Sequence, residues 1–543
     1  MKPNRNLSRA EGRRLGNAAL IAFMLGSLLL LSVIRARFSP IGKTGEAIKT
    51  EEEEQQGMVN KGSVKMETTD EAVVSAGKYL VEPNSWTLNR ICGEISTTRS
   101  DVELKLQSAA EEEEEESHPK TADTSGGGGG GGASASTTTV AATDRVSKPV
   151  CYETSRRSDT CEAAGDVRVQ GRSQTIHVGP LDHEWKTKPY CRKHDAFALS
   201  HVKEWTLRPL SSPGAGAGAA TTPPPPQCTV NSSAPTAFVM STGGFTGNLF
   251  HDYTDVLIPA FITAHRFAGE VQFLVSSFKS WWTNRYLQIF QQLSKYEVID
   301  VDNDDEVRCY GSVVVGPTFH RELGIDATKT PSGQSMVDFR AMLRGAFGLE
   351  RAAAEPSGDK WDIRRRPRLL IIARRSSRAF LNERAMADMA MSLGFDVRVG
   401  EPDISTDVSK FARLVNSADV MIGVHGAGLT NMVFLPAGAV LIQVVPYGGL
   451  EWLARGTFKE PSADMQIHYM EYMIQLDETT LSEQYPKDHP VLTDPASIHK
   501  QGWDAMKTVY LDKQNVRPHL GRLKITFMEA LKLLPHGQQA NNN

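Results

Sequence analysis

The stretch VMIGVHGAGLTNMVFLPAGAVLIQVVP, residues 420–446, places two apolar runs of strand length on either side of a glycine-rich turn. Runs without polar alternation are typical of strands that are covered on both faces of a parallel sheet. The residues LTNMVFL after the glycines have the pattern of a helix. We therefore predict that His425-Gly426-Ala427-Gly428 forms a strand-to-helix turn at the carboxyl edge of an α/β sheet, where backbone N–H groups favour anions.

The spacing of these glycines limits which anion the turn could bind. It matches neither the G-x-G-x-x-G pattern nor the P-loop G-x-x-x-x-G-K-[ST], so it supports neither nicotinamide nor ATP binding. The diphosphate of a sugar nucleotide is the remaining natural ligand. Glycine is also required where a helix packs tightly on a strand, and a histidine such as His425 is often a core residue, so both packing explanations stay open.

Outside this stretch, apolar runs of strand length alternate with segments of helical periodicity in two successive blocks. The strand-like segments are 236–241, 271–277, 297–302, 310–316, 364–374, 395–401, 419–424 and 439–445. The helical segments are 248–267, 281–296, 378–394 and 408–418. The alternation predicts two Rossmann-like lobes that face a cleft. We place the N-terminal lobe at 146–362, with a low-complexity insert at 211–226, and the C-terminal lobe at 363–543.

The N-terminal region predicts a membrane anchor and a stem. Residues 15–34 carry no charge and are long enough for a helix to cross the hydrocarbon core of roughly 30 Å. Basic residues dominate 1–14, which we expect to be a cytosolic tail. Residues 35–145 carry glutamate runs and too few apolar residues to fold, as in a disordered stem. A cleaved signal peptide is the alternative, but its apolar core is shorter and small residues follow it, whereas RARF follows here.

Composition restricts the class of protein. A net charge of −4 over 543 residues argues against a nucleic-acid binder steered by bulk charge. All six cysteines follow the predicted anchor on the lumenal side, where disulfides form, and their spacing matches no zinc site. Six cysteines allow fifteen pairings, so the pairing stays open, as does the alternative of free thiols. Asn231-Ser232-Ser233 is a predicted surface N-glycosylation site.

The glycine-rich stretch belongs to a longer series of segments that resembles plant glycosyltransferase family 61. The other segments of this series are GGFTGNLFHDYTDVLIPAF at 243–261, WWTNRYLQIFQQLSKYEVID at 281–300, CYGSVVVGPTFHRELGID at 309–326, RPRLLIIARRSSRAFLNE at 366–383, and HPVLTDPASIHKQGWDAMKTVYLDKQNV at 489–516. The resemblance implies a GT-B fold, an inverting mechanism and a UDP-sugar donor. With the anchor and stem, it implies a Golgi type II membrane protein with a lumenal catalytic domain. Where Pro317-Thr318 stand, the family more often has a basic residue, which is a departure on the acceptor side.

Candidate residues for the donor diphosphate follow a strand at the same sheet edge as the glycine turn. Arg374 and Arg378 come directly after RLLIIA, and guanidinium groups bind phosphate oxygens in pairs. A charged surface loop is the alternative. The other expected nucleotide-sugar contacts are Gly426, Gly428, Leu429, Asn431, Pro446 and Tyr447.

No D-x-D motif follows a convincing strand, so we predict no metal site and no cofactor. The nearest match, DNDD at 302–305, is interpreted as a solvated loop. Whether the reaction depends on a metal ion stays open.

An inverting transferase needs a base that takes the proton of the acceptor hydroxyl. Asp252 is the first candidate, His251 lies beside it, and His425 is a further candidate for the catalytic site. Alternatively, Asp252 only stabilises the start of its helix. The expected acceptor-binding residues are Trp281, Trp282 and His320. Adjacent helical residues point about 100° apart, so at least one of the two tryptophans is expected in the core.

These features favour a pentosyltransferase that moves arabinofuranose or xylose from UDP-arabinofuranose or UDP-xylose onto xylan or a related wall glycan. The resemblance implies this because family members in grasses modify xylan. A more distant relative xylosylates N-glycans, so a beta-1,2-xylosyltransferase acting on N-glycans or glycoproteins is the alternative enzyme. A non-catalytic Golgi protein that binds glycans or acts as a scaffold is the third hypothesis. The expected partners are the membrane, through one helix, and a complex of Golgi glycosyltransferases.

Overall fold

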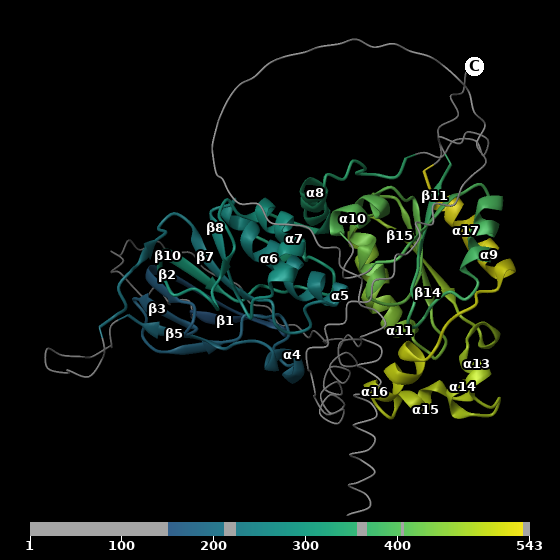
Figure 1. Cartoon of the computed structure of the whole chain (residues 1–543), viewed down its shortest axis with the longest axis horizontal. Helices are drawn as coiled ribbons and strands as arrows, with labels where there is room; N and C mark the ends of the chain where they lie inside the picture. Colours follow the sequence, from purple (N-terminus) through teal and green to yellow (C-terminus); the bar gives the residue numbers. More distant parts are fainter. Residues whose placement is uncertain (1–149, 211–223, 356–365, 403–406, 536–543) are drawn as a thin grey trace, which may run out of the picture. The chain divides into compact units, whose positions relative to one another are not determined.

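The computed structural model describes residues 150–210, 224–355, 366–402 and 407–535 (Figure 1). The predicted tail 1–14, anchor 15–34 and stem 35–145 lie outside the described residues, as does most of the insert at 211–226. Within the described ranges, no helix combines the length and apolar character that a membrane span requires. The predictions for the N-terminal region therefore stay predictions.

The first sheet joins a parallel half to a mixed half in which most pairs are antiparallel. Its strand order is β4-β5-β3-β2-β10-β7-β8-β9, with β1 paired to β2 and β6 to β10. Strands β10, β7, β8 and β9 are parallel, whereas β2 runs antiparallel to β10, β1 and β3. The strands are β1 Cys151–Ser155, β2 Ser158–Gln170, β3 Thr175–Gly179, β4 Trp185–Thr187, β5 Trp205–Pro209, β6 Val230–Asn231, β7 Thr236–Ser241, β8 Val271–Ser276, β9 Ile299–Asp300 and β10 Val307–Val315.

The second sheet is parallel throughout. Its order is β12-β11-β13-β14-β15. The strands are β11 Arg368–Ile372, β12 Asp396–Gly400, β13 Val420–Val424, β14 Val440–Val445 and β15 His468–Met473. Every residue of β13 and β14 is buried, as the absence of polar alternation in their sequences predicts.

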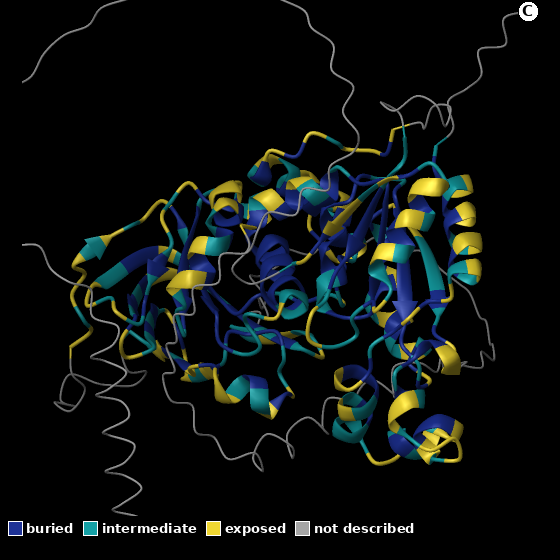
Figure 2. Ribbon diagram, turned by 45° about the vertical axis from the view of Figure 1, so that its right-hand side comes forward, coloured by how far each residue is buried: buried dark blue, intermediate teal, exposed yellow. Residues whose placement is uncertain are grey.

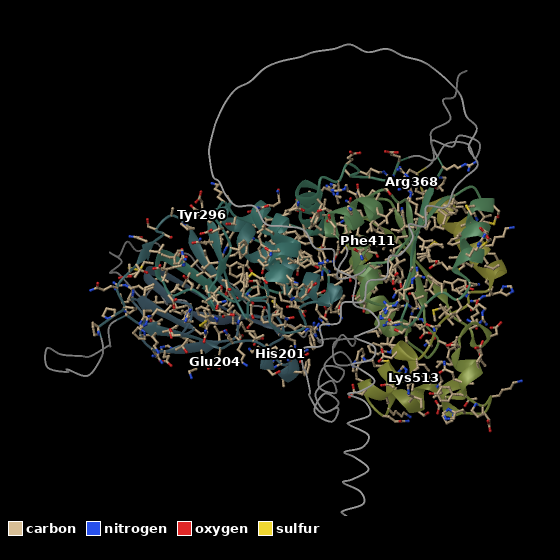
Figure 3. All side chains as sticks on the ribbon, in the orientation of Figure 1. His201, Glu204, Tyr296, Arg368, Phe411 and Lys513 are labelled. Atoms are coloured by element: carbon tan, nitrogen blue, oxygen red, sulfur yellow. A yellow bond between two sulfur atoms is a disulfide. The ribbon has the colours of Figure 1, made fainter. Side chains whose placement is uncertain are left out.

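Both sheets contain a point at which the strand order reverses. In the first sheet the reversal lies between β7 and β10, and in the second it lies between β11 and β13. In open α/β sheets, ligands bind outside the carboxyl ends of the strands at this point. His425 directly follows β13, so the structure confirms that the glycine turn lies at the carboxyl edge of its sheet. In Figure 3, Arg368 at the amino end of β11 and Lys513 lie at opposite ends of the second sheet.

Helical segments connect the strands. They are α4 Ala196–Ser200, α5 Leu249–His251, η2 Asp252–Leu257, α6 Ile258–Ala264, η3 His265–Phe267, α7 Ser280–Leu293, η4 Ala327–Lys329, α8 Met336–Phe347, α9 Glu383–Ser392, α10 Val408–Asn416, η6 Ala427–Phe434, α11 Glu451–Ala454, η7 Arg455–Lys459, α12 Glu460–Asp464, η8 Leu476–Glu478, α13 Leu481–Gln484, α14 Pro490–Thr493, α15 Pro495–His499, α16 Trp503–Met506, η9 Lys507–Asp512 and α17 Leu520–Leu533. Figure 2 shows buried strands inside helices whose outer faces are exposed.

One buried apolar cluster includes side chains from both sheets and from the helical segment after the glycine turn. It contains Phe238 of β7, Met421 of β13 and Phe434 of η6. The ring of Tyr253 in η2 lies 6.1 Å from the ring of Phe434, edge to face. Burial of large side chains of this kind contributes about 1.5–3 kcal/mol each. The packing therefore holds the segment carrying HDYTD against the segment that follows the glycine turn.

Most elements of the parallel sheets agree with the sequence predictions, but strands β6 and β15 were not predicted and three predicted elements differ. The predicted helix 248–267 is interrupted by the π-helix η2, and the predicted helix after the glycine turn is the 3-10 helix η6. The predicted strand 297–302 is reduced to Ile299–Asp300. Strands β1 to β5 were not predicted, so the N-terminal region is only partly Rossmann-like. Cys151 pairs with Cys161 and Cys228 with Cys309, which confirms that some cysteines form disulfides.

Candidate active site

Two arginine side chains converge over Gly426 at the carboxyl ends of β11 and β13. A Cβ atom on Gly426 would lie 3.0 Å from Nη1 of Arg374 and 3.0 Å from Nη1 of Arg378. Gly426 also has a φ of 144°, a conformation that side chains disfavour. Any other residue at 426 would therefore be strained and would fill the space between the two guanidinium groups. The structure thus brings together three residues that the sequence assigned to the donor diphosphate.

Neither of these guanidinium groups pairs with a carboxylate among the residues that the structure describes. Nη1 of Arg378 donates to the carbonyl of His425 at 2.9 Å, and its buried Nε has no hydrogen-bond partner in the described part of the chain. Nε of Arg374 donates to the carbonyl of Ser377 at 2.8 Å. Burial and the neighbouring charge of Arg374 lower the pKa of Arg378 to about 10, so both groups stay charged at neutral pH. The charge of Asp512 acts on both arginines, but its carboxylate pairs with Lys507 at 2.7 Å. Two partly buried cations that form no salt bridge within the described residues favour a bound anion.

His425 lies beneath these two arginines and is buried. Its Nδ1 is 2.7 Å from Nε2 of Gln443, and its backbone N–H donates to the carbonyl of Val444. Burial, followed by the charges of Arg378 and Arg374, lowers the pKa of His425 to about 3. The imidazole is therefore neutral at physiological pH, and a base of such low pKa is poorly matched to proton abstraction near pH 7.

A histidine and a carboxylate form a second cluster after β7, at the reversal point of the first sheet. Nδ1 of His251 lies 2.9 Å from Oδ2 of Asp255, one turn further along the helix. Asp255 is fully buried, and Tyr190 OH and Arg192 Nε also donate to its Oδ2, at 3.0 and 2.9 Å. Burial alone would raise the pKa of Asp255, but Arg192 and His251 lower it to about 2.

An ionised Asp255 determines the tautomer of His251. The carboxylate accepts a hydrogen bond from Nδ1–H, so the lone pair of the imidazole lies on Nε2, which can accept a proton. The ring of Phe245 packs against the ring of His251, with 4.6 Å between centroids and 31° between the ring planes. This is the arrangement of a histidine base oriented by a carboxylate.

Aromatic side chains connect the two clusters. The ring of Phe458, in the π-helix η7, lies 5.7 Å from the ring of His425 and 6.4 Å from the ring of Phe250. The ring of Phe250 in turn lies 5.4 Å from His251. The guanidinium pair and the His251–Asp255 pair are therefore linked through two aromatic residues.

Comparison with known proteins identifies the family of this arrangement. The Glycosyltransferase 61 profile matches residues 246–442, which include His251, Arg374 and Gly426. The chain is 39% identical over 404 residues to beta-1,2-xylosyltransferase XYXT1 of Oryza sativa subsp. japonica, covering 71% of this chain and 84% of that protein.

The chain belongs to glycosyltransferase family 61.

Two further proteins are similar to this chain over a comparable length. Alpha-1,3-arabinosyltransferase XAT3 of Oryza sativa subsp. japonica is 44% identical over 390 residues, which are 71% of this chain and 65% of that protein. Xylan glycosyltransferase MUCI21 of Arabidopsis thaliana is 35% identical over 396 residues, covering 70% and 78% of the two chains. The match therefore spans just under two thirds of the length of the arabinosyltransferase.

Asp252, the first candidate for the base, uses its carboxylate in hydrogen bonds that stabilise the fold. Its carboxylate is buried and accepts hydrogen bonds from the N–H of Gly247 at 2.8 Å, Trp282 Nε1 at 2.8 Å and Tyr286 OH at 3.0 Å. These bonds attach the GGFTGN turn to α7. Asn248, not Asp252, caps the start of this helix, so the structural role of Asp252 differs from the expected one. With its carboxylate engaged in three hydrogen bonds, Asp252 is less suited than His251 to act as the base.

Burial also contradicts the acceptor role expected of Trp282. Its side chain is fully buried and donates to Asp252, so it cannot stack on a sugar. Trp281 is 45% exposed, which confirms that one of the two tryptophans belongs to the core. His320 is half-buried, and burial lowers its pKa. Its Nδ1 accepts a hydrogen bond from the N–H of Asp326 at 3.2 Å.

The other residues that the sequence assigned to the nucleotide-sugar site pack against the glycine turn or bond to its backbone. A Cβ atom on Gly428 would lie 3.3 Å from Pro402 and 3.4 Å from Ile372, so this glycine allows close packing. Leu429 is buried and its N–H donates to Gly426, and Asn431 Nδ2 donates to the carbonyl of Gly428 at 2.9 Å. The ring of Tyr447 packs beside the core, and Pro446 is buried. These positions shape the turn, and their contact with a nucleotide stays a prediction.

The acidic loop DNDD is held by basic residues of the first sheet. Asp304 pairs with Arg308 at 2.6 Å, and Asp305 pairs with Arg172 at 2.7 Å. A surface hollow near Thr236 and Arg266 lies at the amino end of β7, at the opposite end of that strand from His251. Neither feature adjoins the two clusters.

Sequence reasoning missed Asp255, Tyr190 and Arg192. Asp255 follows His251 at the i, i+4 spacing, so the pair was visible in HDYTD as two residues on one helix face. Tyr190 and Arg192 lie more than 60 positions upstream in sequence, at separations of 65 and 63 residues from Asp255. No local pattern could have found them.

Proposed function

We propose that this family 61 protein transfers arabinofuranose or xylose from a UDP-sugar to xylan with inversion, and that its two sheets are the two lobes of a GT-B fold. The names of the similar rice proteins, an arabinosyltransferase and a xylosyltransferase, support a pentose donor. The name of the similar Arabidopsis protein supports xylan as the acceptor. The observation that carries the proposal is the pair of guanidinium groups without carboxylate partners over Gly426, at the strand-order reversal of a parallel sheet.

In the proposed reaction, Nε2 of His251 accepts the proton of a xylan hydroxyl group as its oxygen attacks the anomeric carbon. The bond between this carbon and the β-phosphate oxygen breaks, and the electron pair leaves with UDP. Arg374 and Arg378 stabilise the negative charge that develops on the diphosphate. The negative charge of Asp255 stabilises the imidazolium that forms when His251 takes the proton. Attack opposite the leaving group inverts the anomeric configuration.

Loss of Arg374 tests the donor site. We expect Arg374→Ala to lower kcat/KM for the UDP-pentose by about 100- to 1,000-fold, as is usual when a donor to the leaving charge is removed. The measurement is UDP release by the full-length protein with UDP-arabinofuranose or UDP-xylose and xylo-oligosaccharides. The matched control is Arg375→Ala, because Arg375 is exposed and pairs with Glu401 at 3.0 Å.

The same UDP-release measurements, extended to N-glycan acceptors and to xylan binding, decide between the three functional hypotheses. Activity in Arg374→Ala equal to that of the control would remove Arg374 from the donor site. Transfer to N-glycans but not to xylan would replace the proposed acceptor. Xylan binding without turnover of either donor by the unmodified protein would support a non-catalytic role instead.

We also propose that the protein is a single-pass type II Golgi membrane protein with its catalytic region in the lumen. Residues 15–34 supply the apolar segment, and the basic residues before it predict a cytosolic N-terminus. The two disulfides are of a kind that persists in oxidising compartments. Asn231 is exposed on β6, where an oligosaccharide could be attached.

Glycosylation tests this topology. In full-length protein expressed through a secretory pathway, we expect Asn231→Gln to abolish the mass decrease caused by peptide N-glycosidase. Asn6→Gln is the control, because Asn6-Leu7-Ser8 is also a sequon but is predicted to face the cytosol. The opposite pattern, with Asn6 modified and Asn231 unmodified, would show that the topology is inverted.

A further inference from the structure

A row of hydrogen bonds leads from the surface to His425. Gln443 of β14 is fully buried, and its Nε2 lies 2.7 Å from Nδ1 of His425. Tyr469 OH, on the neighbouring strand β15, donates to Oε1 of Gln443 at 2.7 Å. Glu471, two residues further along β15, binds Arg455 through both carboxylate oxygens at 2.9 Å. None of these four residues was among the predicted site residues.

The geometry determines the direction of these hydrogen bonds. The Tyr469 hydroxyl has two acceptors within reach, Gln443 Oε1 at 2.7 Å and Glu471 Oε1 at 3.2 Å. The shorter contact is at the usual O–H···O distance, and Arg455 already engages Glu471. The hydroxyl therefore donates to Gln443, which directs the amide N–H groups of Gln443 toward His425. Nδ1 of His425 must then accept, and its single proton lies on Nε2.

The charges around His425 favour the same state. Arg374 and Arg378 lie on the loop after β11, Phe458 of η7 packs against the ring, and no carboxylate forms a salt bridge with His425 in the part of the chain that the structure describes. Two positive neighbours and burial disfavour a positive imidazolium. A neutral donor next to two cations can bind an anion without adding a third buried charge.

We propose that Gln443 and Tyr469 are positioning residues that hold His425 in its neutral Nε2–H form, as a hydrogen-bond donor to the UDP diphosphate beside Arg374 and Arg378. The inference rests on the proposed function, because it concerns the same nucleotide-sugar site. It replaces the expectation that His425 acts as a base. Arg455 contributes by keeping Glu471 from competing for the Tyr469 hydroxyl.

Gln443→Glu tests the proposal through the pH dependence of UDP binding. A carboxylate beside Nδ1 would raise the pKa of His425. Below the new pKa, the imidazolium keeps its Nε2–H group; above it, the remaining proton lies on Nδ1 and a lone pair faces the diphosphate. We therefore expect the ratio of the Kd for UDP of the variant to that of the unmodified full-length protein to rise about 10- to 100-fold from low to high pH. The ratio cancels the ionisation of UDP itself.

Tyr469→Phe is the second variant and does not place a new charge in the core. We expect it to weaken UDP binding about 2- to 10-fold, because the amide of Gln443 loses the bond that orients it. Tyr472→Phe is the matched control, since Tyr472 lies on the same strand and bonds to Glu478 instead. A constant Kd ratio for Gln443→Glu, or Tyr469→Phe binding as tightly as the control, would overturn the positioning role. Failure of the unmodified protein to bind UDP would overturn the proposed function itself.

Discussion

Replacement of His251 by alanine is expected to lower kcat by about 100- to 10,000-fold, the usual contribution of a positioned general base. The physical reason is the pair that His251 forms with Asp255 at 2.9 Å, which leaves Nε2 free to accept the acceptor proton. The donor contacts of Arg374 and Arg378 do not involve His251, so we expect the KM for the UDP-sugar to change little. Steady-state kinetics of the full-length protein with varied donor and acceptor measure both quantities.

His265→Ala is the control for this variant. His265 lies at the end of the same helical region but is exposed, and its ring contacts Phe261 rather than a carboxylate. A kcat for His251→Ala close to that of His265→Ala would exclude His251 as the base. In that case the proton acceptor would have to come from another side chain near the guanidinium pair.

The second large effect is expected on stability, from Arg340→Met. The guanidinium of Arg340 in α8 is buried and donates to three backbone carbonyls, those of Val433, Leu435 and Met465. Two of these carbonyls lie at the end of η6, where helical carbonyl groups lack intrahelical partners. Burial lowers the pKa of Arg340 to about 10, so it remains charged at neutral pH.

Methionine fills a similar volume but donates no hydrogen bond, so three buried carbonyl groups would lose their partner. At about 1–3 kcal/mol for each unsatisfied group, we expect the free energy of unfolding to fall by at least about 3 kcal/mol. Chemical denaturation monitored by tryptophan fluorescence measures the change. Arg344→Met on the same helix is the control and should shift stability by less than about 0.5 kcal/mol. Equal stability of the two variants would show that the carbonyl groups find other donors.

Much of the second sheet could be predicted because its signals are local. The continuous apolar runs of β13 and β14 indicate buried parallel strands, and the glycines between them indicate a tight turn. The convergence of Arg374 and Arg378 on Gly426 followed from one rule, that the carboxyl ends of parallel strands share an edge. Strands β1 to β5 were not predicted because their mixed sequences carry no clear period.

The sequence by itself determined the family, most of the parallel strands and the sheet edge on which the arginines meet the glycine turn, because these depend on composition and spacing within a few tens of residues. Only the tertiary structure decided which polar groups are free to react. In the folded chain, Trp282 is buried and donates a hydrogen bond to Asp252. Asp255 pairs with Arg192, which lies 63 positions away in sequence, and Gln443 lies against His425. Burial and hydrogen bonding set the pKa and tautomer of each group, and both depend on neighbours that chain order does not reveal.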